Sequence, residues 1–240
     1  MEMLRYESVK LFLILIFVIG CAHNKIQPVD HIPQFTKINK YEKLIHCQYP
    51  DSFALTQRII LNVAGKQYDF IGQLTMARGR AFRAVTFGEM GGQFIDILST
   101  GDSISILANP AGLPEKPILS GVVEDIKQLF YYNNIEELNY SELTRGLVKI
   151  SINTSGNNQL IYLINSKNKH ILNLNYYSKD KHIRSAEFLE YKKYEGWSRE
   201  IPSYIKLTNH RWHYSLEIRL LKFGTEYNSD KVFKKTNLEK

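Results

Sequence analysis

Apolar residues recur at helical spacing in one long stretch of the chain, residues 118–132. The polar residues between them, Glu124, Asp125, Lys127 and Gln128, are expected on a solvated face. An isolated amphipathic helix of this length is stable only if another layer covers its apolar face. Spacings of three and four place these apolar residues together on that face: Ile118, Leu119, Val122, Val123, Ile126, Leu129 and Phe130.

The sequence on both sides of this helix alternates between apolar and polar residues, which is typical of half-buried strands. Tight turns should join the strands before the helix into an antiparallel meander. Residues 134–145 fit a short second helix. The expected strands are 59–63, 67–76, 81–87, 93–99, 103–107, 147–152, 160–164, 171–177, 183–191, 203–208 and 212–223.

These elements predict a mainly β fold with one α layer. About eleven amphipathic strands curl into an antiparallel, incomplete and half-open β-barrel, wrapped on the amphipathic helix. Two interiors are compatible with this pattern. The barrel and the helix either enclose an apolar cavity or pack together as a filled core.

The N-terminal residues 1–20 have the features of an export signal. Arg5 and Lys10 supply positive charge, and residues 11–20 are an unbroken apolar run of ten. That length fits the core of a signal peptide and is too short to span a bilayer.

The signal ends in the sequence VIGC at 18–21, which resembles the bacterial lipobox. The resemblance implies that cleavage occurs before Cys21 and that this cysteine is acylated. Several acyl chains on one residue anchor a protein stably to a membrane. The absence of aspartate at Ala22 implies the outer membrane, with the protein on its periplasmic face. The alternative is an ordinary secretory signal with a coincidental cysteine.

The rest of the chain divides into a tether, a folded domain and a tail. Residues 21–43 are polar with little periodicity and form the lipidated N-terminus and its flexible tether. The folded domain is expected over 44–226, followed by a basic tail at 227–240. Only one further cysteine is present, Cys47, so a disulfide scaffold is excluded, and it is expected to be a small buried apolar residue.

Composition and charge limit the classes of molecule that the protein is expected to bind. The 240 residues are 44% hydrophobic and 23% charged, which suits one globular domain. The net charge of +7 is spread over turns and the tail, where charges mostly form a solvated surface. If these charges bind a partner, the predicted location favours anionic lipid head groups over nucleic acid. We expect a monomer.

The sequence contains no signature of catalysis. A nucleophile elbow, a phosphate-binding loop and a dinucleotide fingerprint are absent. His210 and His213 are three residues apart, which on a strand places them on opposite faces and argues against a metal site. Glu124 and Asp125 are neighbours on the solvated helix face and do not form an acid–base pair. We expect a protein without enzymatic activity, metal or cofactor.

A lipobox followed by strands, a helix and more strands resembles the lipoprotein-localisation family of the carrier LolA and the receptor LolB. The best local match is FRAVTFGEMGGQFIDI at 82–97, which is similar to the receptor's third and fourth strands. A second match is 191–223, which is similar to the family's closing hairpin. In the receptor a leucine protrudes from the turn between those strands and engages the membrane. Met90 falls at that position, beside Gly91 and Gly92.

The resemblance implies a cargo of acyl chains, from a lipid or a lipoprotein, received from a LolA-like periplasmic carrier and bound in an apolar cavity. An alternative is a LolB-like lipoprotein that uses the same fold as a binding or structural module, associated with lipid or aryl-polyene biosynthesis. Large, adaptable side chains would line the cavity. The candidates are Tyr68, Phe70, Leu74, Met76, Ile104, Ile106, Val122, Ile126, Trp212 and Tyr214.

Overall fold

The computed structural model describes residues 44–45, 48–77, 81–88, 91–100, 103–110, 112, 119–130, 137–143, 146–154 and 156–225. The signal peptide, the tether and the tail lie outside these residues, as do Cys21, Cys47 and Met90. What was inferred for them therefore stays a prediction.

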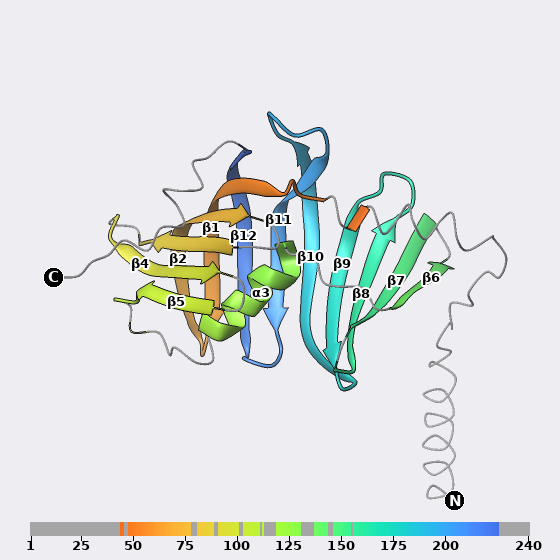
Figure 1. Ribbon diagram of the computed structural model, residues 1–240, viewed down its shortest axis with the longest axis horizontal. Coiled ribbons are helices and arrows are strands. Elements are labelled where there is room, and N and C mark those ends of the chain that lie inside the picture. The colour runs from red at the N-terminus through yellow and green to blue at the C-terminus, as the bar shows by residue number, and fades with distance from the viewer. Residues whose placement is uncertain are drawn as a thin grey trace, which may run out of the picture.

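Within the described residues, twelve strands form one antiparallel sheet in the order β5-β4-β3-β2-β1-β12-β11-β10-β9-β8-β7-β6 (Figure 1). The strands are β1 (Ser52–Val63), β2 (Lys66–Ala77), β3 (Ala81–Phe87), β4 (Gln93–Thr100), β5 (Ser103–Ala108), β6 (Glu137–Leu143), β7 (Leu147–Thr154), β8 (Asn158–Asn165), β9 (Ile171–Ser178), β10 (Lys181–Lys193), β11 (Glu200–Asn209) and β12 (Tyr214–Gly224).

The sheet consists of two meanders that meet where β1 pairs with β12. Among the strands that the structure describes, that pairing is the only step in the order that joins strands not adjacent in sequence. Strands β5 and β6 therefore form the two free edges of an open sheet. The expected meander of five strands and the half-open antiparallel barrel with one helix are confirmed.

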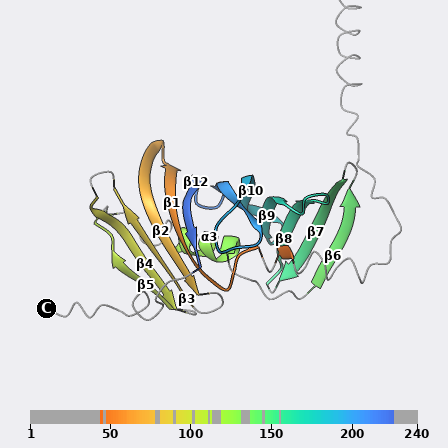
Figure 2. The same cartoon turned by 90° about the horizontal axis from the view of Figure 1, so that it is seen from above.

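The helix α3 (Ser120–Phe130) is the chain's link between the two free edges, β5 and β6. It therefore crosses the concave face of the sheet. Its eleven residues give a length of about 16 Å. Figure 1 shows α3 in front of β12 and β11, and Figure 2 shows it between the two wings of the curved sheet.

The expected second helix at 134–145 is wrong, because Glu137–Leu143 forms the edge strand β6. In the register with β7, Leu138 pairs with Ile152, and Tyr140 pairs with Ile150, which is fully buried. Apolar residues two positions apart suit a strand. Pairing with β7 satisfies the backbone of this segment, whereas a short helix without a covering layer is marginal.

Alternating inward-facing residues of both wings build the core. One wing contributes core residues from β1–β4, and the opposite wing contributes core residues from β7 and β8. The sequence pattern predicted a strand in each of these segments. The largest fully buried side chains include Phe53, Leu74, Met76, Phe82, Ile97, Val148, Ile150, Leu160 and Ile164.

Candidate functional site

A cavity of about 80 Å³ lies between the middle of α3 and the wing formed by β1–β4 and β12. On the helix, Val122 and Ile126 line it and are only half-buried, whereas Val123 and Phe130 are buried. Val122 and Ile126 pack against the edge of the core, and the buried Leu129 and Phe130 line the cavity beside them. The lining from the strands is largely apolar and includes Ile59, Leu61, Phe70, Leu74, Ala84, Ile95, Ile97, Leu216 and Ile218.

Four of the residues expected to line a cavity do so. Tyr68, a fifth candidate, lies beside them, stacked on Phe70 with the ring centroids 6.2 Å apart. Both rings also contact Phe94, so this end of the wing is aromatic. The four lining residues come from β2 and α3 and are Phe70, Leu74, Val122 and Ile126.

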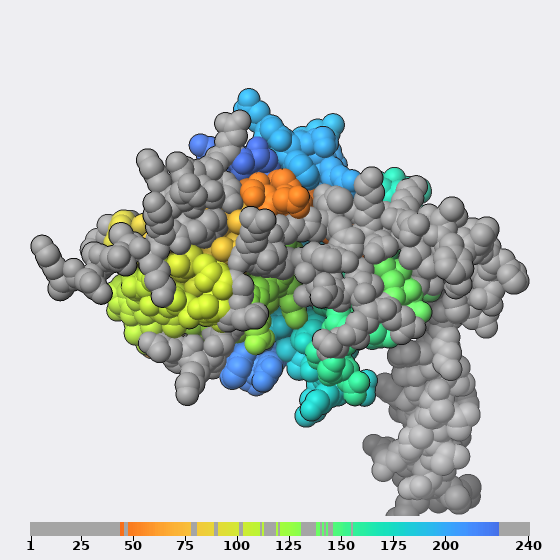
Figure 3. All heavy atoms as spheres, viewed as in Figure 1, coloured from red at the N-terminus to blue at the C-terminus, as the bar shows by residue number. Residues whose placement is uncertain are grey.

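The other five candidates lie elsewhere. Met76 is fully buried in the packed core, and Ile106 is half-buried against that core. Ile104 is outside the lining and is 47% exposed on the edge strand β5, which forms part of the yellow-green surface in Figure 3. Trp212 lies in the turn before β12, and Tyr214 belongs to a buried polar cluster.

Three lining residues that the pattern of the sequence did not single out form one row across the concave face. Gln57 on β1 pairs with Gly72 on β2, and Gly72 pairs with Thr86 on β3. A Cβ at Gly72 would lie 2.6 Å from Cδ1 of Ile59. A glycine is therefore required here for the Ile59 side chain to pack over the strand. The available signal was a glycine in the middle of a strand, which often marks a close approach.

The prediction that Asp125 lies on the solvated face of the helix is wrong, because this residue is 1% exposed. Its two carboxylate oxygens accept hydrogen bonds from Asn209 Nδ2, at 3.1 and 3.3 Å, and one accepts from the Tyr214 hydroxyl. Arg184 Nε lies against Oδ1 as an ion pair, without the alignment of a hydrogen bond. These partners come from β10, β11 and the start of β12, so the cluster ties α3 to the middle of the sheet.

Burial controls the electrostatics of this cluster. It raises the pKa of the Asp125 carboxyl, and the neighbouring guanidinium of Arg184 opposes that shift. Burial and the Asp125 carboxylate together raise the pKa of Tyr214, which keeps its hydroxyl a hydrogen-bond donor. Arg184 also donates to Glu124, whose side chain is 52% exposed, so the cationic charge is shared between two acids.

The helix comes closest to the β11–β12 turn at Gly121. A Cβ there would lie 2.7 Å from Cδ1 of Trp212 and 3.0 Å from the Tyr214 hydroxyl. The turn is held in place because Asn209 Oδ1 accepts a hydrogen bond from the Trp212 backbone, at 3.0 Å. The first part of α3 is therefore fixed by a close backbone approach and by the polar cluster.

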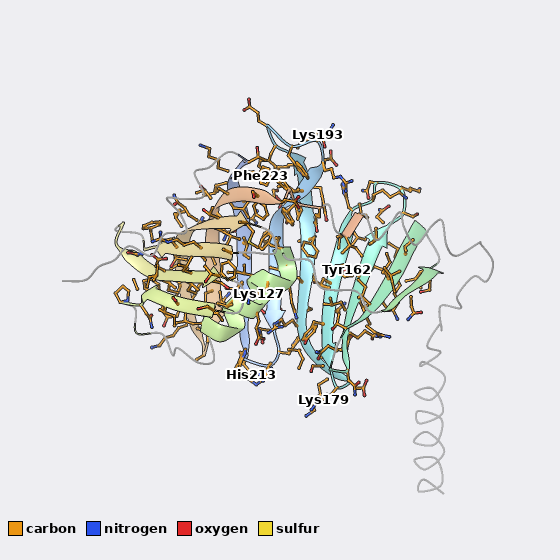
Figure 4. All side chains as sticks on the ribbon, in the orientation of Figure 1. Lys127, Tyr162, Lys179, Lys193, His213 and Phe223 are labelled. Atoms are coloured by element: carbon orange, nitrogen blue, oxygen red, sulfur yellow. The ribbon has the colours of Figure 1, made fainter. Side chains whose placement is uncertain are left out.

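Aromatic contacts fix the other end of the helix. Phe130 meets Tyr49 edge-on, with ring centroids 5.0 Å apart, and lies 5.9 Å from Phe53. Phe53 stacks on Phe223, which Figure 4 labels at the opposite end of the sheet from His213 in the β11–β12 turn. The helix is held at both ends and, through Asp125, at its middle, and residues from Val122 to Phe130 line the cavity.

The β3–β4 hairpin, expected to carry the membrane contact, is held by a bidentate ion pair. Arg83 donates to Asp96 at 3.1 and 2.7 Å, and Gln93 donates to the same carboxylate at 2.8 Å. At the tip, Gly91 N donates to Gly88 O at 2.9 Å, and Gly91 has a positive φ of 77°. A residue with a side chain rarely adopts that φ.

The sequence pattern predicted that His210 and His213 lie on a strand. This prediction is wrong, because residues 210–213 form a turn. His210 lies next to His182, with ring centroids 4.4 Å apart. Partial burial lowers the pKa of His210, and the neighbouring His182 and His213 add to that shift. Within the part of the chain that the structure describes, no cluster of three or more His, Cys, Asp or Glu side chains could hold a metal.

None of the described helices is long and apolar enough to cross a membrane. No protein-family model matches the sequence, and no curated protein matches it.

Two solved structures share the fold of this chain. A LolA superfamily protein from Nitrosomonas europaea superposes with a TM-score of 0.54 at 12% identity, over 85% of this chain and 99% of that one. An outer membrane lipoprotein-sorting protein domain from Vibrio parahaemolyticus gives a TM-score of 0.53 at 11% identity, over 82% of this chain and 96% of that one. At these identities the similarity establishes the fold.

Proposed function

We propose that this chain, which has the LolA/LolB-like fold, is a non-enzymatic lipoprotein that binds acyl chains of a lipid or lipoprotein and helps deliver them to the outer membrane. One observation carries the proposal. The apolar cavity lies beneath the middle of α3, where Val122 and Ile126 are only half-buried. This apolar space between the helix and the sheet is the place where an acyl chain would lie.

The size of the cavity implies that the helix moves when cargo binds. At about 80 Å³ the cavity is smaller than a typical ligand site of roughly 300–1,000 Å³. An acyl chain enters only if α3 shifts away from β1–β4. Each buried methylene contributes about 0.8 kcal/mol, so about ten of them offset an opening cost of several kcal/mol.

The delivery step rests on the sequence at the two predicted membrane contacts. Acylation at Cys21 would hold the domain at the periplasmic face of the outer membrane, on a tether formed by residues 21–43. A LolA-like periplasmic carrier would supply the cargo. The description of the Vibrio parahaemolyticus protein as lipoprotein-sorting supports this class of cargo. The glycine-flanked turn near Gly91 would place Met90 at the membrane surface.

A second candidate function is a binding or structural module that holds no lipid. The small volume of the cavity favours it, because a well-packed domain can retain a void of this size. The polar cluster at Asp125 would then serve only to fix the helix.

Native mass spectrometry distinguishes the two functions. The chain from Ala22 onward, which contains every described residue, is purified from cells without detergent and examined for bound lipid. It is then titrated with a fluorescent sixteen-carbon acyl probe. The proposal predicts copurified acyl lipid and saturable binding of the probe. A protein that carries no lipid and leaves the probe free belongs to the second class.

A further inference from the structure

The apolar lining of the cavity is interrupted by two buried polar atoms that have no hydrogen-bond partner. Gln57 is 7% exposed, and its Oε1 is buried without a partner among the described residues. The Thr86 hydroxyl oxygen is buried in the same condition. Both residues line the cavity. Buried polar groups are nearly always paired, so two unpaired ones at one cavity indicate a partner that binds there.

The register of the sheet brings these two atoms to the same part of the wall. Gln57 and Thr86 lie on either side of Gly72 in one row of paired residues. The neighbouring row is apolar, because Ile59 pairs with Phe70. The Ile59 side chain reaches over Gly72, where a Cβ would lie 2.6 Å from Ile59 Cδ1, so the glycine leaves room for that side chain between the glutamine and the threonine.

The two groups set the chemistry of the partner. A glutamine Oε1 only accepts hydrogen bonds, and a threonine hydroxyl both donates and accepts. The complement is therefore a neutral group with an O–H or N–H donor, placed within an apolar chain. A carboxylate head does not fit, since it would face Gln57 Oε1 and the buried Asp125, which lines the same cavity. A plain saturated chain would leave both protein groups unpaired.

We propose that the cavity selects acyl chains that carry a hydroxyl or an amide N–H, with Gln57 as acceptor and Thr86 as its second hydrogen-bond partner. This inference rests on the proposed acyl-binding function and narrows its ligand. Hydroxylated acyl chains and N-acylated amines both supply the donor. Sites that hydrogen-bond a substrate group discriminate strongly against an analogue that lacks it.

Three neutral ligands of equal chain length test the proposal on the chain from Ala22 onward. They are methyl hexadecanoate, methyl 3-hydroxyhexadecanoate and N-methylhexadecanamide, each measured by displacement of a fluorescent acyl probe. We expect at least one donor-bearing ligand to bind about tenfold more tightly than the plain ester. Preference for the hydroxy ester identifies a hydroxylated chain as the source, and preference for the amide identifies an N-acyl group.

Two nearly isosteric variants test whether Gln57 and Thr86 cause the preference for donor-bearing ligands. Gln57→Leu and Thr86→Val remove the unpaired atoms while preserving volume, so folding should be retained. Each should reduce the tenfold preference to less than about twofold, because the plain ester no longer leaves that buried polar atom unpaired and the donor-bearing ligands lose their partner. Gln67→Leu, the same change at an exposed position of β2, is the matched control and should keep the preference.

The possible results separate this inference from the acyl-binding function. Equal affinity of the wild type for all three ligands would overturn the inference but preserve acyl binding, and would assign the unpaired atoms to bound water. A preference that survives both variants would also overturn it. Displacement by none of the ligands would reject the function and the inference together.

Discussion

Arg184 on β10 and Asp125 on α3 form an ion pair whose side chains are only 4% and 1% exposed. The two residues come from segments far apart in sequence, and the pair fixes the helix over the concave face. Separating them without solvent leaves two buried charges unpaired, which is costly. Any movement of α3 that admits cargo therefore has to separate Asp125 from Arg184. Water has to enter to solvate the two charges when they separate.

Removal of the carboxylate should therefore destabilise the domain. We expect Asp125→Asn to lower the free energy of unfolding by about 3 kcal/mol near pH 4, because one carboxyl oxygen that faces Arg184 Nε and Asn209 Nδ2 becomes an amide NH2 that cannot accept a hydrogen bond. Urea denaturation of the chain from Ala22 onward measures the change. Glu124→Gln is the control, since Glu124 contacts the same guanidinium but is half exposed, and it should cost less than about 1 kcal/mol. Equal losses in the two variants would contradict the assigned role of burial.

The raised pKa of Asp125 gives its contribution to stability a distinct pH dependence. Since folding raises this pKa above the unfolded value of about 3.9, the contribution is complete below that pH and decreases as pH rises through the folded pKa. The difference in Tm between the wild type and Asp125→Asn should therefore shrink as pH rises from about 3.5 to about 7.

Asp69 provides a control of opposite sign. The hydrogen bond from Arg58 lowers the pKa of this exposed carboxyl, so its contribution is complete above about pH 3.9 and is lost as pH falls. The difference between the wild type and Asp69→Asn should therefore grow over the same increase in pH. Two differences that change in the same direction would refute the opposite pKa shifts.

A larger side chain at Ile126 distinguishes a binding cavity from a packed core. Ile126 lines the cavity and is half-buried, so the ring in Ile126→Phe has space to enter. We expect the Tm to stay the same or rise, while affinity for the acyl probe falls at least about tenfold because the ring occupies the site. In a filled core the same change would cost about 1–3 kcal/mol. A destabilised variant that still binds the probe would exclude the proposed site.

Cys21→Ser tests the membrane anchor in cells. The serine cannot form the thioether to lipid, so the protein should remain unprocessed or appear in the soluble periplasmic fraction. Fractionation and mass analysis of the amino terminus measure this. Unchanged cleavage together with unchanged retention in the outer membrane would mean that Cys21 is not the anchor.

Met90→Glu tests the predicted membrane contact at the β3–β4 turn. An apolar side chain buried in a membrane contributes about 1–3 kcal/mol, and a carboxylate at that position would oppose insertion. We expect an unchanged melting curve and a loss of cargo transfer to liposomes, measured on the chain from Ala22 onward. A lowered Tm with normal transfer would instead place Met90 against the core.

The local residue pattern was sufficient for most strands and for the one helix. Alternation along β1–β5 and along 214–224 follows from the two-residue period of a strand, and the spacing of Val122, Ile126 and Leu129 follows from the period of a helix. Tight turns then made the first meander the natural pairing. The edge strand β6 was missed because its short apolar pattern also fits a helix, and only the backbone of β7 decides between them.

Tertiary structure alone decided the features that matter for the site. Asp125 has the spacing of a solvated residue, and its burial depends on Arg184, Asn209 and Tyr214, which the β1–β12 pairing and the β10–β12 meander bring beneath the helix. Gln57 and Thr86 come into one row only through the register on either side of Gly72. Period and turn chemistry act between residues close in sequence, whereas register, burial of charge and unfilled volume depend on segments that meet only after folding.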